Sequence, residues 1–454
     1  MITEYYHKNK RFPFVIDDTI DQNRNVFTVL VGKNGTGKST LLGSVVRNLI
    51  GDQKSRHFYR DEELGFRNFE RSQLSLDRGP DRIIAVSTSP FDKFPVKRSL
   101  EEIEEYSYLG LRGLHTINFG LAYLSKIISS LIESIHQDFH QAWEIGNILK
   151  YLGYKDFIRV VFNISSSKRQ LESFIKLESY ESLFDRRISP SLRHLNKRFF
   201  FDEYGNIDTN KFDYLRHLSH KILEYDLRRN YELIIHRNGI ESEYNLDHDF
   251  DKEIIFLIQS GLLRLRDVVL ESLKNPSPFS IKNASSGEQS VILSMLGIAS
   301  QIKDNSLICI DEPEICLHPQ WQEKYIQILI STFENYRNCQ FLIATHSPQI
   351  ISNLRNRNCF ILSMESGKID NAARFINNSS DYQLANVFDS PGFKNEYLSR
   401  IALNIFTKVS KRKRFDNDDL EKLRILEHQS LFLESSDPVL DIYNSLKKML
   451  KVYG

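Results

Sequence analysis

The chain has 454 residues, more than one hydrophobic core usually organises, which predicts two or three domains. Its formal charge is +1, so no global field draws it to nucleic acid or membrane, and any such binding needs a local patch. It lacks a signal-peptide start and any apolar run of the roughly 18 residues that span a bilayer, and its four cysteines have no disulfide or metal-ligand spacing, so we expect a cytoplasmic protein without a membrane partner.

The first strong pattern is a glycine-rich loop between a predicted strand over 26–31 and a helix that begins near residue 40. Glycines permit the tight turn that aims main-chain N–H groups at phosphate oxygens, and the helix N-terminus adds a favourable dipole. We therefore expect ATP to bind here, with Lys38 at the β- and γ-phosphates and Ser39 on Mg²⁺. The predicted nucleotide-binding residues are Gly32, Asn34, Gly35, Gly37, Lys38, Ser39 and Thr40.

A long insert follows the next predicted strand, over 83–87. Apolar residues between 121 and 135 fall at three- and four-residue steps, which predicts a helix, and Asn238-Gly239 predicts a β-hairpin turn. Residues 251–273 are interpreted as a helix that returns the chain to the core. Basic and aromatic clusters at Arg186-Arg187 and from Arg193 to Phe201 could meet nucleic acid or a partner protein. For the aromatic run over 199–201, a hairpin packed in a small core is favoured.

A second loop, ahead of an apolar helix, contains Ser286, Gly287, Glu288 and Gln289. Ser286 and Gln289 have the spacing of a capping box, so free N–H groups and a positive dipole end are expected there.

Two more buried strands end in polar residues that suit nucleotide chemistry. The strand over 306–310 leads into Asp311 and Glu312, and the strand over 340–344 leads to His346. In open α/β sheets, ligands lie at the carboxyl ends of the strands. We expect Asp311 to share the metal with Ser39, and Glu312, His346 and Lys38 to be the catalytic residues.

Together these motifs resemble ABC-type P-loop ATPases. The resemblance implies an α/β fold, an ABC-type ATPase core with a large, mainly helical insert. It also implies a head-to-tail dimer in which Ser286, Gly287, Glu288 and Gln289 contact ATP on the partner's phosphate loop. His318 stands in place of the family's D-loop aspartate, the residue that makes the usual cross-dimer contact. The usual Q-loop glutamine is missing, with Ser89 or Asp92 as candidate substitutes.

Within that class, the layout resembles the PtuA-type ATPases of Septu and retron anti-phage systems, which are related to the ATPase part of overcoming-lysogenization-defect proteins. This resemblance implies a multimer that regulates a separate HNH nuclease, PtuB, in some cases with a reverse transcriptase and its RNA–DNA product (msDNA). Two alternatives remain: a PARIS-type ATPase that controls a Toprim effector, and a RecF-like DNA-repair clamp switched by ATP.

We expect four parts: an N-terminal half of the ATPase core over 1–95, the insert over 96–277, a C-terminal half over 278–370 and a helical region for partner contacts over 371–454. No Toprim or HNH metal motif is found after His346. The basic run over 408–414 precedes several aspartates and is interpreted as a solvated, charge-balanced face.

Overall fold

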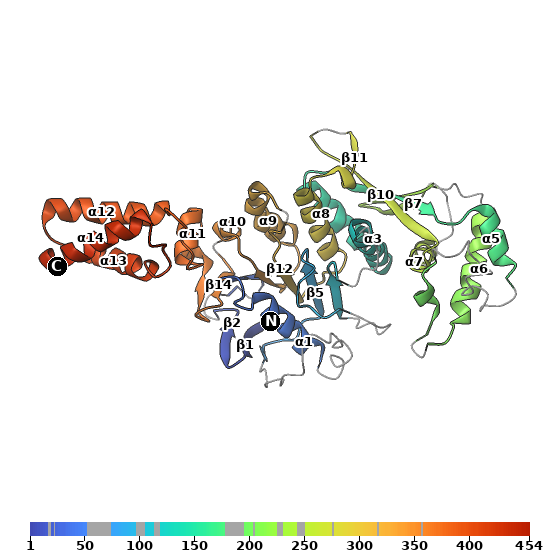
Figure 1. Cartoon of the computed structure of the whole chain (residues 1–454). Helices are drawn as coiled ribbons and strands as arrows, with labels where there is room; N and C mark the ends of the chain where they lie inside the picture. Colours follow the sequence, from blue (N-terminus) through green and yellow to red (C-terminus); the bar gives the residue numbers. More distant parts are fainter. Residues whose placement is uncertain are drawn as a thin grey trace.

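The computed structural model describes residues 1–16, 20–21, 23–51, 74–96, 105–112, 119–177, 195–202, 205–224, 230–242, 250–274, 277–315, 317–355 and 357–454. Figure 1 shows an elongated arrangement with a sheet and its covering helices in the middle. The last helices form a bundle at one end, and the insert forms the other end.

The centre of the molecule is a seven-stranded sheet that confirms the predicted α/β class. Its strands are parallel to their neighbours, except β15, which pairs antiparallel with β14. In sheet order they are β15 (Ile369–Asn371), β14 (Cys359–Ser363), β3 (Val26–Val31), β13 (Gln340–Ala344), β12 (Ser306–Asp311), β5 (Arg82–Ser87) and β6 (Tyr106–Leu109). Because β3, β13 and β12 are adjacent and parallel, their carboxyl ends meet at one edge of the sheet.

Each central strand sends alternate side chains into two different cores, since successive residues of a strand face opposite sides. Val29 and Ile343 join the core beneath α3 (Phe119–Gln137), α8 (Ser286–Ala299), α9 (Pro319–Thr332) and α10 (Pro348–Ser352). Leu30 and Leu342 join the core on the other face, beneath α1 (Lys38–Ile50). A small antiparallel sheet also packs on that second face, formed by β1 (Ile2–His7), β2 (Lys10–Pro13) and β4 (Leu74–Leu76). Burial on both faces explains the continuous apolar runs of these strands.

The insert is mainly helical in its described residues, and its helices pack on a five-stranded antiparallel sheet. The strands are β7 (Phe157–Ile164), β8 (Asn230–His236), β9 (Gly239–Ser242), β10 (Leu263–Glu271) and β11 (Pro278–Ser280). Besides α3, the helices are α4 (His140–Tyr151), α5 (Lys168–Ile175), α6 (Thr209–Glu224) and α7 (Phe250–Ser260).

The predicted hairpin is confirmed by the pairing of β8 with β9, where Gly239 has φ +119°. A Cβ at Gly239 would lie 2.8 Å from the Phe139 ring, so both the backbone and the packing require glycine. The single helix predicted over 251–273 is wrong beyond Ser260, because the chain turns there and continues as β10. Buried and more exposed residues largely alternate along β10, and this period of two belongs to a strand.

The aromatic run of the insert is packed, as expected, but Lys197–Phe200 form a 3-10 helix (η5) and not a hairpin strand. Arg186, Arg187 and Arg193 lie outside the described residues. Phe200 is fully buried, and Phe199 makes edge-on ring contacts with Phe200 and Phe256. Phe201 forms an isolated antiparallel bridge with Ile207. These rings therefore contribute to a core rather than to an exposed stacking surface.

The C-terminal helices have an apolar core of their own. They are α11 (Ser380–Asn386), α12 (Glu396–Arg412), α13 (Asn417–Gln429) and α14 (Pro438–Tyr453). Among the helices in the described ranges, none combines the length and apolar character needed to cross a bilayer. The proposed four-part division of the chain stays a prediction.

Candidate functional site

The glycine-rich loop connects β3 to α1 at the carboxyl edge of the central sheet. Helix α1 begins at Lys38 without a side-chain cap, and Gly37 precedes it in a left-handed conformation with φ +91°. The first N–H that bonds back into this helix is that of Leu41, to the Gly37 carbonyl at 2.8 Å. The preceding amides, of Lys38, Ser39 and Thr40, are thus free to face an anionic ligand at the positive end of the helix.

The side chain of Lys38 is buried and folds back over this loop. Its Nζ donates to the Gly32 carbonyl at 2.8 Å and lies 3.3 Å from Nδ1 of His346. Burial lowers the pKa of Lys38, and nearby carboxylates, Glu312 first among them, oppose that shift. A lysine ammonium that is shielded from water and lies near free main-chain amides is well suited to bind a phosphate group. Asn34 and Gly35, at the tip of the same loop, are exposed.

Ser39 and Asp311 meet across the two predicted halves of the core. The Ser39 hydroxyl donates to Oδ1 of Asp311 at 3.0 Å. Burial raises the pKa of Asp311 to about 7, because a charged carboxylate is poorly solvated there. A divalent cation would compensate that charge, and a hydroxyl beside a carboxylate is the hard oxygen donor set that Mg²⁺ takes. The residues present therefore fit a magnesium ion next to the phosphate loop.

Glu312 and His346 complete a continuous group of polar side chains with Lys38. Glu312 has φ +50°, a left-handed conformation, and its N–H donates to the Ala344 carbonyl at 2.9 Å. Nε2 of His346 lies 3.6 Å from Oε1 of Glu312. Burial lowers the pKa of His346 to about 4, and the Lys38 cation lowers it further in the same direction. The imidazole is therefore neutral at pH 7, with Nδ1 facing the lysine and Nε2 facing the glutamate.

Glu314 is a site residue that the sequence analysis missed. Its buried carboxylate accepts a short hydrogen bond from the His346 N–H and another bond from the Thr345 side chain. Burial raises the pKa of Glu314. Glu314 thus fixes the backbone of the loop that presents His346. Its place two residues after Glu312 was the available signal.

Glu365 was also missed, and its position just beyond β14 gives no sequence signal. The Lys33 N–H donates to its carboxylate at 2.6 Å, and a Cβ on Gly32 would lie 2.7 Å from the same carboxylate. On the outer side of the loop, Nζ of Lys33 lies 3.9 Å from the ring centroid of Phe432. The connection between α13 and α14 therefore contacts the phosphate loop through Phe432.

The loop containing Ser286, Gly287, Glu288 and Gln289 opens helix α8, as predicted, but its cap differs from the prediction. The N-cap is Ser285, whose Oγ accepts from the Glu288 N–H at 3.2 Å. Gln289 instead donates to main-chain carbonyls of the preceding turn. The cap is therefore one residue earlier than the capping-box spacing suggests.

The insert holds this same loop through Tyr154, a contact that the sequence analysis missed. The Tyr154 hydroxyl donates to Oε1 of Glu288 at 2.5 Å, and its ring lies against Phe279. Tyr154 also forms a bridge with Ser272, at the end of β10. The orientation of Glu288 thus depends on the insert.

The structure does not bring together the two loops of one chain that are predicted to bind ATP. Val291 and Ile292 of α8 belong to the core on one face of the central sheet. Leu41 and Leu42 of α1 belong to the core on the opposite face. Figure 1 shows the two helices on opposite sides of β12 and β5.

The remaining expected positions have mainly structural contacts. Asp92 is buried and bonds to the Tyr108 hydroxyl at 2.7 Å and to Arg112 at 2.5 Å. Ser89 accepts a bond from the Phe91 N–H at 3.2 Å. His318 caps α9 by accepting from the Gln320 N–H. These contacts give no support to Ser89 or Asp92 as a substitute for the Q-loop glutamine.

Comparison with known proteins agrees with this geometry. A family described as "AAA domain, putative AbiEii toxin, Type IV TA system" matches residues 27–352, well over half of the chain. The chain belongs to this family. The matched region runs from β3, through the insert, to α10, so the family covers both halves of the site.

Curated proteins that are similar in sequence to this chain include two whose names refer to retrons. "Retron Ec83 probable ATPase" of Escherichia coli is 23% identical over 409 residues, covering 80% of this chain and 71% of that protein. "Retron Vc95 probable ATPase" of Vibrio cholerae serotype O1 biovar El Tor is 21% identical over 371 residues, covering 74% and 68%. The Smc head domain of Pyrococcus furiosus superposes with a TM-score of 0.29 at 12% identity, covering 81% of this chain and 95% of that one. A superposition with that score carries no argument.

Proposed function

We propose that this protein is an ATPase that hydrolyses ATP at a site shared by two copies of the chain and thereby regulates a separate HNH nuclease in anti-phage defence. The ATPase part of this proposal rests on one observation, a connected group of polar side chains. His346 lies between Lys38 and Glu312 and is close to both, and Ser39 is hydrogen-bonded to Asp311. Lys38 and Ser39 are the first two residues of α1, where the free amides lie.

The proposed roles follow from where each group lies. Lys38 and the loop amides bind the β- and γ-phosphates, while Ser39 and Asp311 hold Mg²⁺. Magnesium, when bound, neutralises charge on the phosphate oxygens. Glu312 orients the attacking water and accepts its proton. Neutral His346 can donate from Nε2 toward the γ-phosphate, because its Nδ1 faces the Lys38 ammonium.

We propose a shared site because the two loops that would contact ATP are too far apart within one chain to meet on the same nucleotide. The loop Ser286, Gly287, Glu288 and Gln289 lies across the sheet from α1, so a head-to-tail pairing is needed to bring it to a partner's phosphate loop. There the first amides of α8 would face the γ-phosphate. Such a dimer could pair further into a higher assembly.

The regulatory role rests on the resemblance to PtuA-type ATPases and on the retron names of the two relatives. In this proposal, ATP changes the arrangement of the two copies, and a nuclease that prefers one arrangement is switched by that difference in affinity. A reverse transcriptase and its msDNA would be further partners if the protein belongs to a retron.

The test is to purify the protein with and without the products of neighbouring genes and to assay ATP hydrolysis and the cleavage of plasmid and tRNA over a range of ATP concentrations. We expect ATP hydrolysis by this chain alone, and ATP-dependent nucleic-acid cleavage only with an HNH partner bound. Metal-dependent cutting by this chain alone that survives loss of the ATP site would contradict the regulator proposal. A Toprim gene as the co-purifying effector would favour the PARIS-type alternative.

A further inference from the structure

The two longest C-terminal helices, α12 and α14, run parallel, so their carboxyl ends lie together. Where they start, the Lys394 N–H donates to Oδ2 of Asp437, just ahead of α14, at 2.8 Å. Where they end, Nζ of Lys413 lies 5.1 Å from the ring centroid of Tyr453. Residues that follow α12 and residues of the last turns of α14 therefore form one surface at the end of the bundle (Figure 1).

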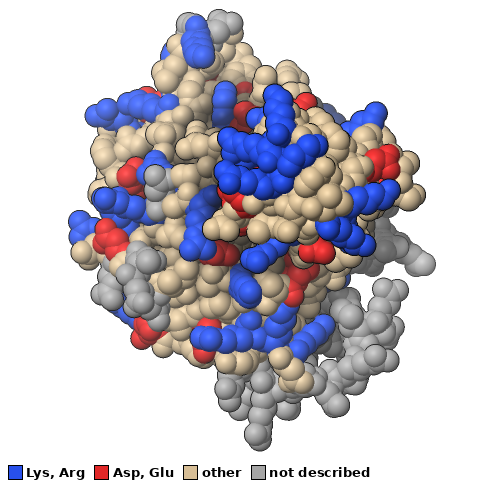
Figure 2. All heavy atoms as spheres, turned by 90° about the vertical axis from the view of Figure 1, so that its left-hand side faces the viewer, with Lys and Arg blue, Asp and Glu red and all other residues tan. Residues whose placement is uncertain are grey.

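This end of the bundle, which we name the basic tip, carries seven exposed cationic side chains. They are Lys411, Arg412, Lys413, Arg414, Lys447, Lys448 and Lys451. Figure 2 views the molecule from the side of the C-terminal bundle and shows a dense group of Lys and Arg side chains on it. The chain as a whole has a charge of only +1, so the tip is a local concentration of positive charge.

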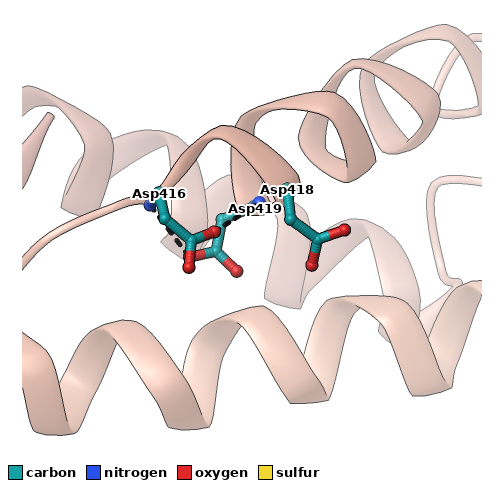
Figure 3. Close-up of side chains that lie close together, drawn as sticks. All are labelled: Asp416, Asp418 and Asp419. Atoms are coloured by element: carbon teal, nitrogen blue, oxygen red, sulfur yellow. Dashed lines mark hydrogen bonds between the residues drawn. The ribbon is translucent and has the colours of Figure 1, made fainter.

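The neighbouring carboxylates do not neutralise the basic tip. Asp416 and Asp419 bond reciprocally to each other's N–H groups as the capping box of α13 (Figure 3). Lys408 donates to both carboxylates, at 2.6 and 2.9 Å, and Lys422 pairs with Asp418 at 2.7 Å. Among the described residues, no carboxylate lies within ion-pair distance of any of the seven tip cations. The interpretation as a charge-balanced face therefore applies to Lys408 but not to the tip.

Helix electrostatics explain only part of the tip. A helix C-terminus favours cations in its last turn, and Lys411, Arg412 and Lys451 lie in such turns. The other four cations, Lys413, Arg414, Lys447 and Lys448, lie outside them. In the described part of the chain none of these four has a carboxylate partner, although Lys413 and Lys447 lie over the rings of Tyr453 and Tyr443. Like charges on one surface repel one another in the free protein, and an anionic ligand would remove that repulsion.

We propose that the basic tip binds the phosphate backbone of nucleic acid, without reading its sequence. Five of the seven cations are lysines, which are depleted from protein–protein interfaces but serve well as point charges for phosphates. Regularly spaced phosphates can contact several of these cations at once and release their counterions. This inference does not depend on the nuclease partner.

The test compares two variants with equal loss of charge, measured by fluorescence anisotropy with labelled single- and double-stranded DNA of about 30 nucleotides per strand, long enough for several phosphate contacts. The tip variant carries Lys413→Asn, Arg414→Gln, Lys447→Gln and Lys448→Gln; asparagine at 413 tolerates the left-handed backbone. The control variant carries Lys93→Gln, Lys274→Gln, Lys303→Gln and Lys324→Gln, at exposed lysines elsewhere.

At about 50 mM salt we expect the tip variant to bind DNA at least tenfold more weakly and with a shallower dependence on salt, since fewer counterions are released. The control variant should bind within twofold of the unmodified protein. Equal losses in both variants, or no loss in the tip variant, would overturn the proposal. So would displacement of DNA by polyglutamate at equal charge concentration, because that result would assign the tip to an acidic protein. Thermal unfolding of both variants verifies that they are folded.

Discussion

At the scale of single residues, the site is built around one strained position. Glu312 adopts a left-handed conformation that costs a non-glycine residue about 1 to 2 kcal/mol. It is held there by the bond from its N–H to the Ala344 carbonyl. This turn at the end of β12 directs the carboxylate toward His346 instead of along the strand. Backbone strain of this kind occurs at functional sites.

The first prediction separates the roles of Glu312 and Lys38. Glu312→Gln should retain ATP affinity but lose turnover by about 100-fold or more, because it removes a proton acceptor. Lys38→Ala should weaken ATP binding itself, since it removes a cation from the phosphate site. Equilibrium dialysis with Mg²⁺ and steady-state ATPase assays measure the two effects, with Glu323→Gln as an exposed control. An equal loss of ATP affinity in both variants would contradict this assignment.

A second prediction concerns the protonation of His346. Its pKa is lowered to about 4, whereas an unfolded chain protonates histidine near 6.5. Between these values the unfolded state binds more protons, so this residue makes the protein less stable as the pH falls from about 6.5 toward 4. Histidine NMR signals, assigned with His346→Gln, should show a midpoint near 4 without nucleotide. A bound triphosphate should move that midpoint upward, because negative charge favours the imidazolium.

A His346 midpoint near the ordinary value in the nucleotide-free protein would contradict this environment. The other histidines serve as internal controls in the same spectra.

At the scale of elements, α8 is positioned by two parts of the chain. Its far end packs in the core of the central sheet, while its first turn is bonded to Tyr154 of the insert. The insert is therefore connected to the loop that we propose to contact a partner's ATP. A change in the insert, such as the binding of another protein, could alter hydrolysis through this bond.

The third prediction tests that connection with Tyr154→Phe. The substitution removes the hydroxyl that bonds Glu288 but keeps the ring against Phe279, so stability should fall by only roughly 1 kcal/mol. The ATPase rate should fall several-fold, while the affinity for ATP stays within twofold. Tyr151→Phe, on the exposed neighbouring tyrosine, is the matched control. Unchanged turnover in Tyr154→Phe would show that this bond has only a structural role.

At the scale of the whole molecule, the central sheet separates the two loops that nucleotide hydrolysis would need. The phosphate loop opens α1 on one face, and the loop of Ser286 opens α8 on the other. At the edge of the core, Phe432 of the C-terminal region contacts the phosphate loop through Lys33. In the proposed dimer, a nucleotide at the phosphate loop would be placed to affect both a second copy of the chain and the C-terminal region.

The fourth prediction uses complementation between two inactive variants. Lys38→Ala and Ser286→Arg should each be nearly inactive alone. In a mixed dimer, one interface combines both defects and the other has both loops intact. Equal mixing should therefore restore up to about one quarter of the unmodified rate, because half of the dimers are mixed and each has one intact site of two.

Subunit exchange is verified with two differently tagged chains. No recovery at any mixing ratio, despite exchange, would exclude a site completed in trans.

Local sequence patterns were sufficient to predict a feature when all of its residues lie in one helix, strand or turn. The central strands, α1, α3, the hairpin at Gly239 and the residues at the carboxyl edge of the sheet were all predictable, because burial on both faces, helical periodicity and glycine at positive φ each leave a short-range pattern. The strand β10 was not predictable in this way, because its apolar residues are also compatible with a helix. Only its pairing with β7 in the structure identifies it as a strand.

The tertiary structure alone decided which distant residues act together. The sequence determined the phosphate loop and the acidic strand end, since each motif is contiguous. It could not place Glu365 at Gly32, Tyr154 at Glu288 or Phe432 at Lys33, because these contacts join elements far apart in the chain. Nor could it separate Lys408, neutralised by the cap of α13, from the cations of the basic tip, which have no carboxylate partner in the described ranges. Charge pairing depends on distances in space, and only the packing of α12, α13 and α14 sets those distances.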